Sequence, residues 1–113
     1  MDLNMTTEKN VFGAKMFSAL ANPGRLLILK HLAQGPSSVN DIAKVVGIKQ
    51  SITSQHLSIL ASAGLVVFEK SGNSHLYRLR GPRIARILEL MEEFYEIHLE
   101  ELHSLLSGQP ARQ

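Results

Sequence analysis

The stretch GIKQSITSQHLSILASAGLV, residues 47–66, decides the fold of this chain. Glycines stand at its start and near its end, short hydroxyl and amide side chains fill its front half, and aliphatic residues dominate its back half. Leu57 and Leu60 fall on one face of a helix. An ordinary surface helix carries Glu and Lys on its exposed face, and this one carries neither. We predict a helix over residues 50–63 whose outer face contacts something other than water.

The outer face of this predicted helix consists of short or medium polar side chains without charge. They are Gln50, Ser51, Ser54, Gln55 and Ser58. Such donors and acceptors can hydrogen-bond to the edges of bases once Lys and Arg elsewhere hold the phosphates. The ordinary alternative is a face that is merely solvated. Ile52 and Ile59 flank this face, and we expect them to pack against a neighbouring helix.

Three helices are predicted before this one. The first covers residues 7–20, where apolar side chains recur at helical spacing. An Asn-Pro pair at 22–23, and a Ser at 38 with Asp at 41, are N-terminal capping signals for the second and third. A Gly-Pro pair ends the second helix and Gly47 ends the third. Two helices joined by a short turn with glycine, the second polar on its outer face, form a helix-turn-helix.

A β-hairpin is predicted directly after the helix-turn-helix. Val66 to Lys70 and His75 to Arg80 are β-prone runs on either side of the turn SGNS. The polar side chains expected to project from it are Lys70, Asn73, His75 and Arg78. A hairpin in this position is a wing, and wings contact the DNA backbone or the minor groove.

One long helix is predicted to finish the chain, from Pro82 to Gly108. Apolar and aromatic side chains and one His recur on it in steps of three and four, which is a heptad-like seam. The seam residues are Leu88, Met91, Tyr95, His98, Leu102 and Leu105. Glu residues lie off the seam. This pattern indicates a dimerisation helix with a solvated acidic face.

Charge is distributed unevenly along the chain. Residues 44–86 carry seven Lys or Arg against one Glu, which is a net charge of +6. Residues 87–113 carry one Arg against six Glu, which is −5, although the whole chain is only +2. A basic middle beside an acidic end is typical of a protein that binds a polyanion with one side and turns the other away.

Three segments together resemble the ArsR/SmtB family of dimeric winged-helix repressors: FSALANPGRLLILKHL, DIAKVVGIKQSITSQHLSILASAGLV and HLYRL. The likeness covers roughly residues 12–95. It implies a homodimer built from the first and last helices, with two recognition helices in successive major grooves of an imperfect palindrome. It also implies a repressor that releases DNA when an effector binds.

The resemblance also implies roles for particular residues. Gln50, Ser51, Ser54 and Gln55 fall where the family reads bases, and Lys70, Asn73 and His75 fall at the wing tip. The expected dimer contacts on the first and last helices are Phe12, Met16, Leu88, Met91, Tyr95, His98 and Leu102.

Two departures from the family pattern bear on function. Lys49 begins the recognition helix where the family often has Ser or Thr, which weakens the cap and adds a phosphate contact. The family's metal sensors use either a Cys pair or Asp and His ligands on the last helix. This chain has no Cys, and the ligand positions of the last helix fall on Gly81 and Arg83 and near Phe94 and Ile97. We therefore expect no metal site of these kinds and no cofactor.

The histidines receive separate predictions. His98 and His103 are five residues apart, on nearly opposite sides of a helix, so one protomer cannot hold a metal ion with both. Two hypotheses stay open for His98: it meets a ligand from the partner helix, or it titrates with pH and loosens the pairing. We expect His56 to be a hydrogen-bonded structural residue rather than a base reader, and His31 to be buried or at a boundary.

Several classes of protein are excluded. With no Cys there is no disulfide, thiolate metal site or Cys nucleophile. The N-terminus lacks the pattern of a secretory signal, and no apolar run reaches the length of a membrane span, so we expect a cytoplasmic protein. No phosphate-binding Gly loop, nucleophile elbow or acid-supported Ser–His pair is present, so we expect no enzyme.

The predicted fold is mostly α with one β-hairpin, a winged helix-turn-helix of four helices, the wing and a fifth helix. Residues 1–107 form the DNA-binding and dimerisation domain and 108–113 a flexible tail. The predicted function is a sequence-specific transcriptional regulator, a dimeric repressor whose partners are double-stranded DNA and a second copy. The alternative is a winged-helix module that binds another protein and no DNA, which the basic 44–86 segment disfavours. An organic effector, pH or no effector at all stay open as regulation.

Overall fold

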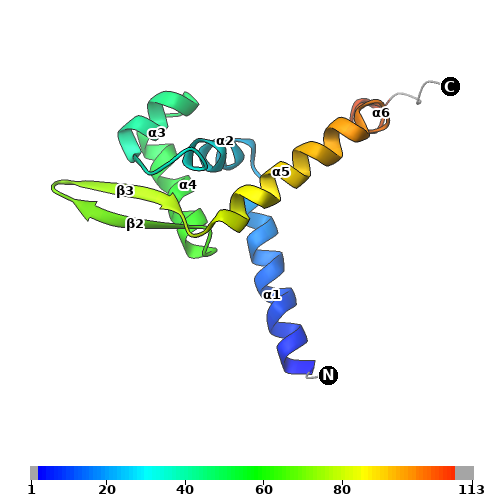
Figure 1. Cartoon of the computed structure of the whole chain (residues 1–113), viewed down its shortest axis with the longest axis horizontal. Helices are drawn as coiled ribbons and strands as arrows, with labels where there is room; N and C mark the ends of the chain where they lie inside the picture. Colours follow the sequence, from blue (N-terminus) through cyan, green and yellow to red (C-terminus); the bar gives the residue numbers. More distant parts are fainter. Residues whose placement is uncertain (1–2, 109–113) are drawn as a thin grey trace.

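The four predicted helices, the hairpin and the predicted last helical region occur in the predicted order in the computed structural model, which describes residues 3–108. The elements are α1 (Leu3–Leu20), α2 (Pro23–Leu32), β1 (Ser37–Ser38), α3 (Val39–Val46), α4 (Gln50–Ser62), β2 (Val66–Ser71), β3 (Ser74–Leu79), α5 (Pro82–Ile97) and α6 (Leu99–Ser107). Figure 1 shows α2, α3 and α4 gathered beside the wing, with α1 and α5 projecting from this body in different directions. Apart from Gly108, the predicted tail lies outside the described residues.

Helix capping follows the sequence signals. The Asn22 side chain accepts a hydrogen bond from the backbone N–H of Arg25, and the Ser38 side chain accepts one from that of Asp41. Gly47 has a φ of 71°, the left-handed conformation that ends α3. Lys49 stands at the N-cap of α4 without a side-chain hydrogen bond, which confirms the predicted weak cap.

The core lies between α2, α3, α4 and the base of the wing. Its least exposed large apolar side chains are Ile28, Leu29, Ile42, Leu57, Leu60 and Val66. Thr53 is buried among them, and its hydroxyl donates to the backbone oxygen of Lys49 over 2.9 Å. This bond satisfies a polar group that would otherwise be costly to bury. The core therefore fixes the inner face of α4.

The sheet has three strands in the order β1-β3-β2, all antiparallel. The sequence predicted only β2 and β3; β1 is two residues long and pairs with Tyr77 and Leu76. So short a strand has no periodicity of its own, and the pairing is what creates it. At the wing tip only Gly72 and Asn73 lie between the paired Ser71 and Ser74. Gly72 has φ 61° and Asn73 does not have positive φ, which matches a type II′ hairpin turn.

Two predicted helix boundaries are wrong. α1 begins at Leu3 rather than at residue 7, and the predicted single final helix is broken at His98. His98 has φ −111° and ψ 22°, and α6 turns away from the line of α5 (Figure 1). Neither Gly nor Pro marks this break, and the apolar pattern continues across it. The heptad-like seam is therefore not one continuous stripe.

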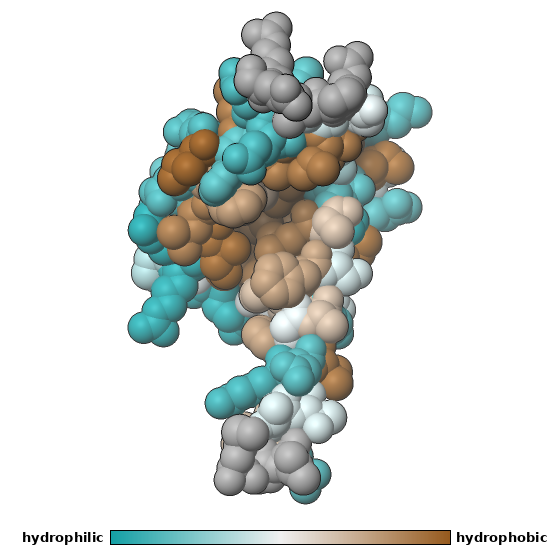
Figure 2. All heavy atoms as spheres, turned by 90° about the vertical axis from the view of Figure 1, so that its right-hand side faces the viewer, coloured by the Kyte–Doolittle hydropathy of each residue, from teal (hydrophilic) through white to brown (hydrophobic). Residues whose placement is uncertain are grey.

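An apolar face remains uncovered along the two projecting arms. Figure 2 shows a hollow of hydrophobic residues on the side of the molecule where α1, α5 and α6 lie. The large apolar residues exposed on these helices include Val11, Phe12, Phe17, Leu90, Met91, Phe94, Ile97, Leu105 and Leu106. Among the helices of residues 3–108, none combines the length and the hydropathy needed to cross a membrane.

Candidate nucleic-acid interface

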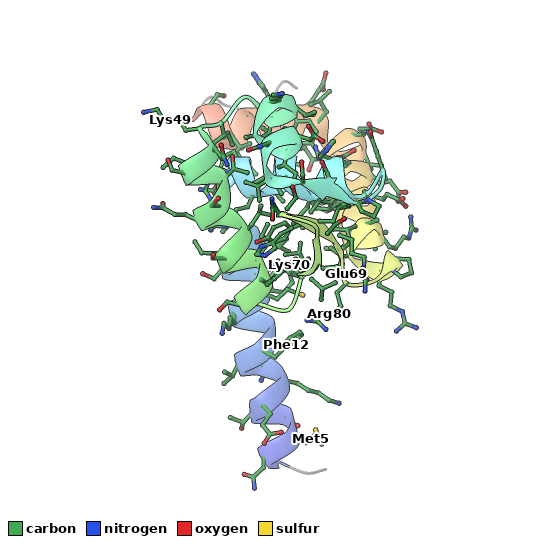
Figure 3. The ribbon with its side chains drawn as sticks, turned by 90° about the vertical axis from the view of Figure 1, so that its left-hand side faces the viewer. Met5, Phe12, Lys49, Glu69, Lys70 and Arg80 are labelled. Atoms are coloured by element: carbon green, nitrogen blue, oxygen red, sulfur yellow. The ribbon has the colours of Figure 1, made fainter. Side chains whose placement is uncertain are left out.

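The outer face of α4 is polar and exposed, as predicted. Its five polar members, all exposed, are Gln50, Ser51, Ser54, Gln55 and Ser58. On the opposite side Thr53, Leu57 and Leu60 are fully buried, so the orientation of the helix is settled by its core contacts. Figure 3 shows α4 along one edge of the molecule with Lys49 projecting at its start. These side chains are presented on a rigid element rather than on a loop.

The predicted packing of Ile52 and Ile59 against a neighbouring helix is wrong. Their exposed fractions are 39% and 43%, and they border the polar face instead. Ile59 opens onto a groove of about 370 Å³ between α1 and α4. Their spacing of seven residues does place the two Ile side chains on one side of α4. They remain exposed because Leu57 and Leu60 already fill the core.

The wing residues divide between its two faces. In the register, Lys70 lies opposite His75 and Val66 lies opposite Leu79, and all four point to the same face. Arg78 lies opposite Val67 on the other face, where its Nε is 3.7 Å from Glu69 Oε1. Figure 3, which looks along the wing from its tip, places Lys70 nearer to α4 than Glu69. The predicted wing set is thus not a single cluster.

The wing tip and the start of α4 border one polar concavity of about 190 Å³. It brings together three predicted residues, Gln50, Asn73 and His75. Three further polar residues line it that were not predicted as site residues: Asn40, Ser74, and Ser38, which was predicted only as a helix cap. The signal available in the sequence was a polar side chain, Asn40, two residues after the predicted Ser38 cap.

Phe68 is a further residue that sequence reasoning missed. It is 50% exposed, and its ring lies 4.8 Å from that of His75 and 5.3 Å from that of Tyr77. These aromatic contacts support the face of the wing that carries Lys70 and His75. The alternation of residues along β2 could have placed Phe68 on that face.

The cations of the basic segment do not all serve this surface. Arg86 binds Glu89 and Glu93 on α5, and these carboxylates raise the pKa of Arg86. Arg80 donates to the backbone oxygen of Gly64 over 2.8 Å. Three lysines in this segment have no ion pair within the described residues: Lys44, Lys49 and Lys70. The positive charge available to a polyanion is therefore smaller than the sequence count.

His56 takes part in a side-chain hydrogen bond and His31 lies at the boundary of the core, as predicted. His56 is half-buried, and its Nδ1 lies 3.4 Å from Nη1 of Arg25 on α2. Burial, and secondly the Arg25 charge, lower the pKa of His56. His31 lies at the boundary of the core, with Nε2 3.0 Å from the Ser37 hydroxyl.

The residues predicted for a dimer interface differ in exposure. Phe12, Met91 and Tyr95 are exposed, whereas Met16, His98 and Leu102 are half-buried. Leu88 is only 4% exposed and belongs to the core of the single chain. The prediction of Leu88 as a dimer contact is therefore wrong, because one face of α5 packs against α2 within the single chain.

Titratable side chains on the last two helices do not gather around one point. Within residues 3–108, no three His, Asp or Glu side chains lie close enough to hold one metal ion. His98 Nδ1 is 3.7 Å from Glu101 Oε2, and its ring contacts that of Phe94 at 4.6 Å.

A helix-turn-helix whose second helix exposes a polar face, followed by a hairpin beside it, defines the winged helix-turn-helix class. The chain belongs to the arsR family of bacterial regulatory proteins, whose family model matches residues 22–67. It is a winged helix-turn-helix transcriptional regulator, as its relatives' names indicate.

Two relatives from Mycobacterium tuberculosis illustrate the likeness. The chain is 42% identical over 94 residues to the HTH-type transcriptional regulator NmtR, covering 83% of this chain and 75% of NmtR. It is 37% identical over 89 residues to the regulator Rv0324, covering 79% of this chain but only 39% of that longer protein. A solved structure from Mycobacterium bovis, the homodimeric winged helix-turn-helix DNA-binding domain of Mb0332, is 34% identical with a TM-score of 0.79. That match covers 89% of this chain and 93% of the domain.

Proposed function

We propose that this regulator is a dimeric repressor that binds an imperfect palindrome in double-stranded DNA. The observation that carries the proposal is the exposed polar face of α4, backed by the buried Thr53, Leu57 and Leu60. Such a helix fits the major groove, where the hydrogen-bonding groups of the bases distinguish all base pairs. The wing then lies on the flanking backbone or in the minor groove.

The proposed contacts fall into two sets. The base-contacting set is Gln50, Ser51, Ser54, Gln55 and Ser58. The backbone-contacting set is Lys49, Lys70, Asn73, His75 and Arg78. Gln50 lines the same concavity as Asn73 and His75, so one edge of a groove can meet helix and wing together. Base contacts supply sequence preference, and backbone contacts supply affinity for any DNA.

Arg78 has a smaller proposed role than Lys70. It lies on the other face of the wing and is paired with Glu69, so a phosphate must compete with that carboxylate. Lys70 has no such partner within the described residues. We therefore assign the main backbone contact of the wing to Lys70.

The dimer is proposed to form through the uncovered apolar face of α1 and α5. Phe12, Met91 and Tyr95 contribute exposed area there, and Met16, His98 and, on α6, Leu102 are half-buried members of the proposed set. The Mb0332 domain, which is described as homodimeric, supports the formation of a homodimer. A repressor of this kind acts in the cytoplasm, and an organic effector acting through the dimer is compatible with it.

Gel-shift binding to the protein's own upstream DNA, in a salt series against a random duplex, tests the proposal. We expect salt-sensitive binding with a clear preference for the upstream DNA, because phosphate contacts release counterions and base contacts add selectivity. As a control, Glu100→Ala replaces an exposed side chain on α6, and this variant should bind both duplexes like the unchanged protein. Weak and equal binding to both duplexes contradicts the proposal and favours the protein-binding module.

A further inference from the structure

The guanidinium group of Arg25 joins three helices. Its Nε donates to the backbone oxygen of Ala19, and its Nη2 donates to that of Ser18 over 3.3 Å. Both oxygens belong to the last turn of α1. Its Nη1 lies 3.4 Å from Nδ1 of His56, which is in the middle of α4. One side chain on α2 thus links the end of α1 to α4.

The contact assigns the proton on His56. Because a guanidinium can only donate, Nδ1 of His56 accepts, and the neutral ring carries its hydrogen on Nε2. Nε2 faces Gly24, where an added Cβ would lie only 3.1 Å away, so the ring is held closely on that side too. A second proton would place N–H against N–H and one cation against another.

Nothing nearby offsets that second charge. α4 carries no charged residue besides the titratable His56. None of the charged or titratable groups on the neighbouring helices is paired with His56. On α2, Lys30 pairs with Glu92 and His31 contacts Ser37. On α1, Glu8 and Lys9 are exposed towards its start and Lys15 lines the α1–α4 groove; on α3, Asp41 and Lys44 are exposed. Glu69 and Lys70 are exposed on β2. Within residues 3–108 no carboxylate pairs with His56.

We propose that the Arg25–His56 contact is a brace that holds recognition helix α4 at a fixed angle to α1, and that protonation of His56 opens it and weakens operator binding in acid. The inference rests on the proposed dimeric function, because that angle sets the spacing of two recognition helices across a dimer. Burial and the Arg25 charge lower the pKa of His56, so the brace is closed at neutral pH. His56 and Arg25 are positioning residues and do not contact bases.

The first test compares operator affinity near neutral pH and at about pH 5.5. His56→Gln keeps an acceptor for Arg25 but cannot take up a proton, and all other histidines are the same in the two proteins. We expect the protein with His56 to lose several-fold more affinity in acid than the Gln variant, because only His56 can take up the proton that opens the brace. An equal loss in both proteins overturns the brace.

A second measurement needs no DNA. NMR follows the His56 imidazole and the amides of α1 and α4 through the same pH range. We expect the amides of the last turn of α1 to shift together with the protonation of His56, and Arg25→Lys, which breaks the geometry of the contact, to abolish this coupling. Amides of α1 that do not respond to His56 overturn the brace. A different result would count against the proposed DNA binding alone. In that case the protein shows no preference for operator DNA at neutral pH, but the α1 amides still respond to the protonation of His56.

Discussion

Thr53 and Ser54 are neighbours on α4 with opposite fates. Thr53 is fully buried with its hydroxyl bonded to the Lys49 carbonyl, whereas Ser54 is exposed on the outer face. The difference follows from the angle between consecutive residues on a helix. Each polar side chain of α4 is therefore assigned to core or surface by its position round the axis, not by its chemistry.

Substitutions at Gln55 and Lys70 separate base contacts from backbone contacts. We expect Gln55→Ala to cost about 1–3 kcal/mol on the operator and little on random DNA, because a lost base contact removes selectivity. Lys70→Ala should weaken binding to both duplexes alike and lower the salt dependence. Titrations on operator and random duplexes at several salt concentrations measure both effects.

Arg78→Ala is the internal control for this pair, since Arg78 lies on the other face of the wing and is paired with Glu69. It should cost less than Lys70→Ala. Equal losses on both duplexes for every one of these variants would contradict the assignment of base-reading roles.

The wing is an element whose shape depends on one glycine. Gly72 has φ 61° at the first turn position, a conformation that L side chains adopt only at a cost of about 1–2 kcal/mol. This turn places Asn73 and His75 in the lining of the concavity that Gln50 also lines. Because the tip is exposed, its distortion should leave the core unchanged.

Gly72→Ala should therefore weaken operator binding, and strain confined to the exposed turn should lower the unfolding temperature by no more than about 4–8 °C. Gly81→Ala is the matched control: its φ is −167° and an added Cβ meets nothing within 4 Å, so binding should be unchanged. Binding titrations and thermal unfolding of the three proteins decide this. Full operator affinity in the Gly72 variant would show that the wing tip makes no contact with DNA.

The chain as a whole is less compact than a globular domain of similar length. Its radius of gyration is 16.7 Å, against about 13 Å for a compact domain of about 100 residues. The excess comes from the projecting arms, α1 and α5 with α6, which also carry the uncovered apolar face (Figures 1 and 2). An exposed face of this kind is typical of a protein–protein contact.

Phe12→Asp tests the dimer at this scale. Phe12 is 59% exposed on α1, and a charge buried in an apolar interface is costly unless it is paired. We expect a monomer that keeps its helical content and loses most of its operator affinity, because two half-sites are no longer bound together. Analytical ultracentrifugation measures the change in association.

Val45→Asp is the control, because Val45 is 64% exposed on α3, outside the arms. It should leave the association unchanged. A Phe12→Asp protein that still sediments as a dimer would place the interface elsewhere on the molecule.

The sequence by itself determined the helix caps at Asn22 and Ser38, the helix-turn-helix, the polar face of α4 and the two-residue tip of the wing. These features depend on local propensity, periodicity and capping, which act between residues close together in the chain. Only the tertiary structure decided the strand β1, the break at His98, the burial of Leu88 and the separation of Arg78 from Lys70. It also brought Arg25 to His56, 31 residues apart. Such contacts join residues that are far apart in the chain, and local sequence patterns do not predict which of these residues meet.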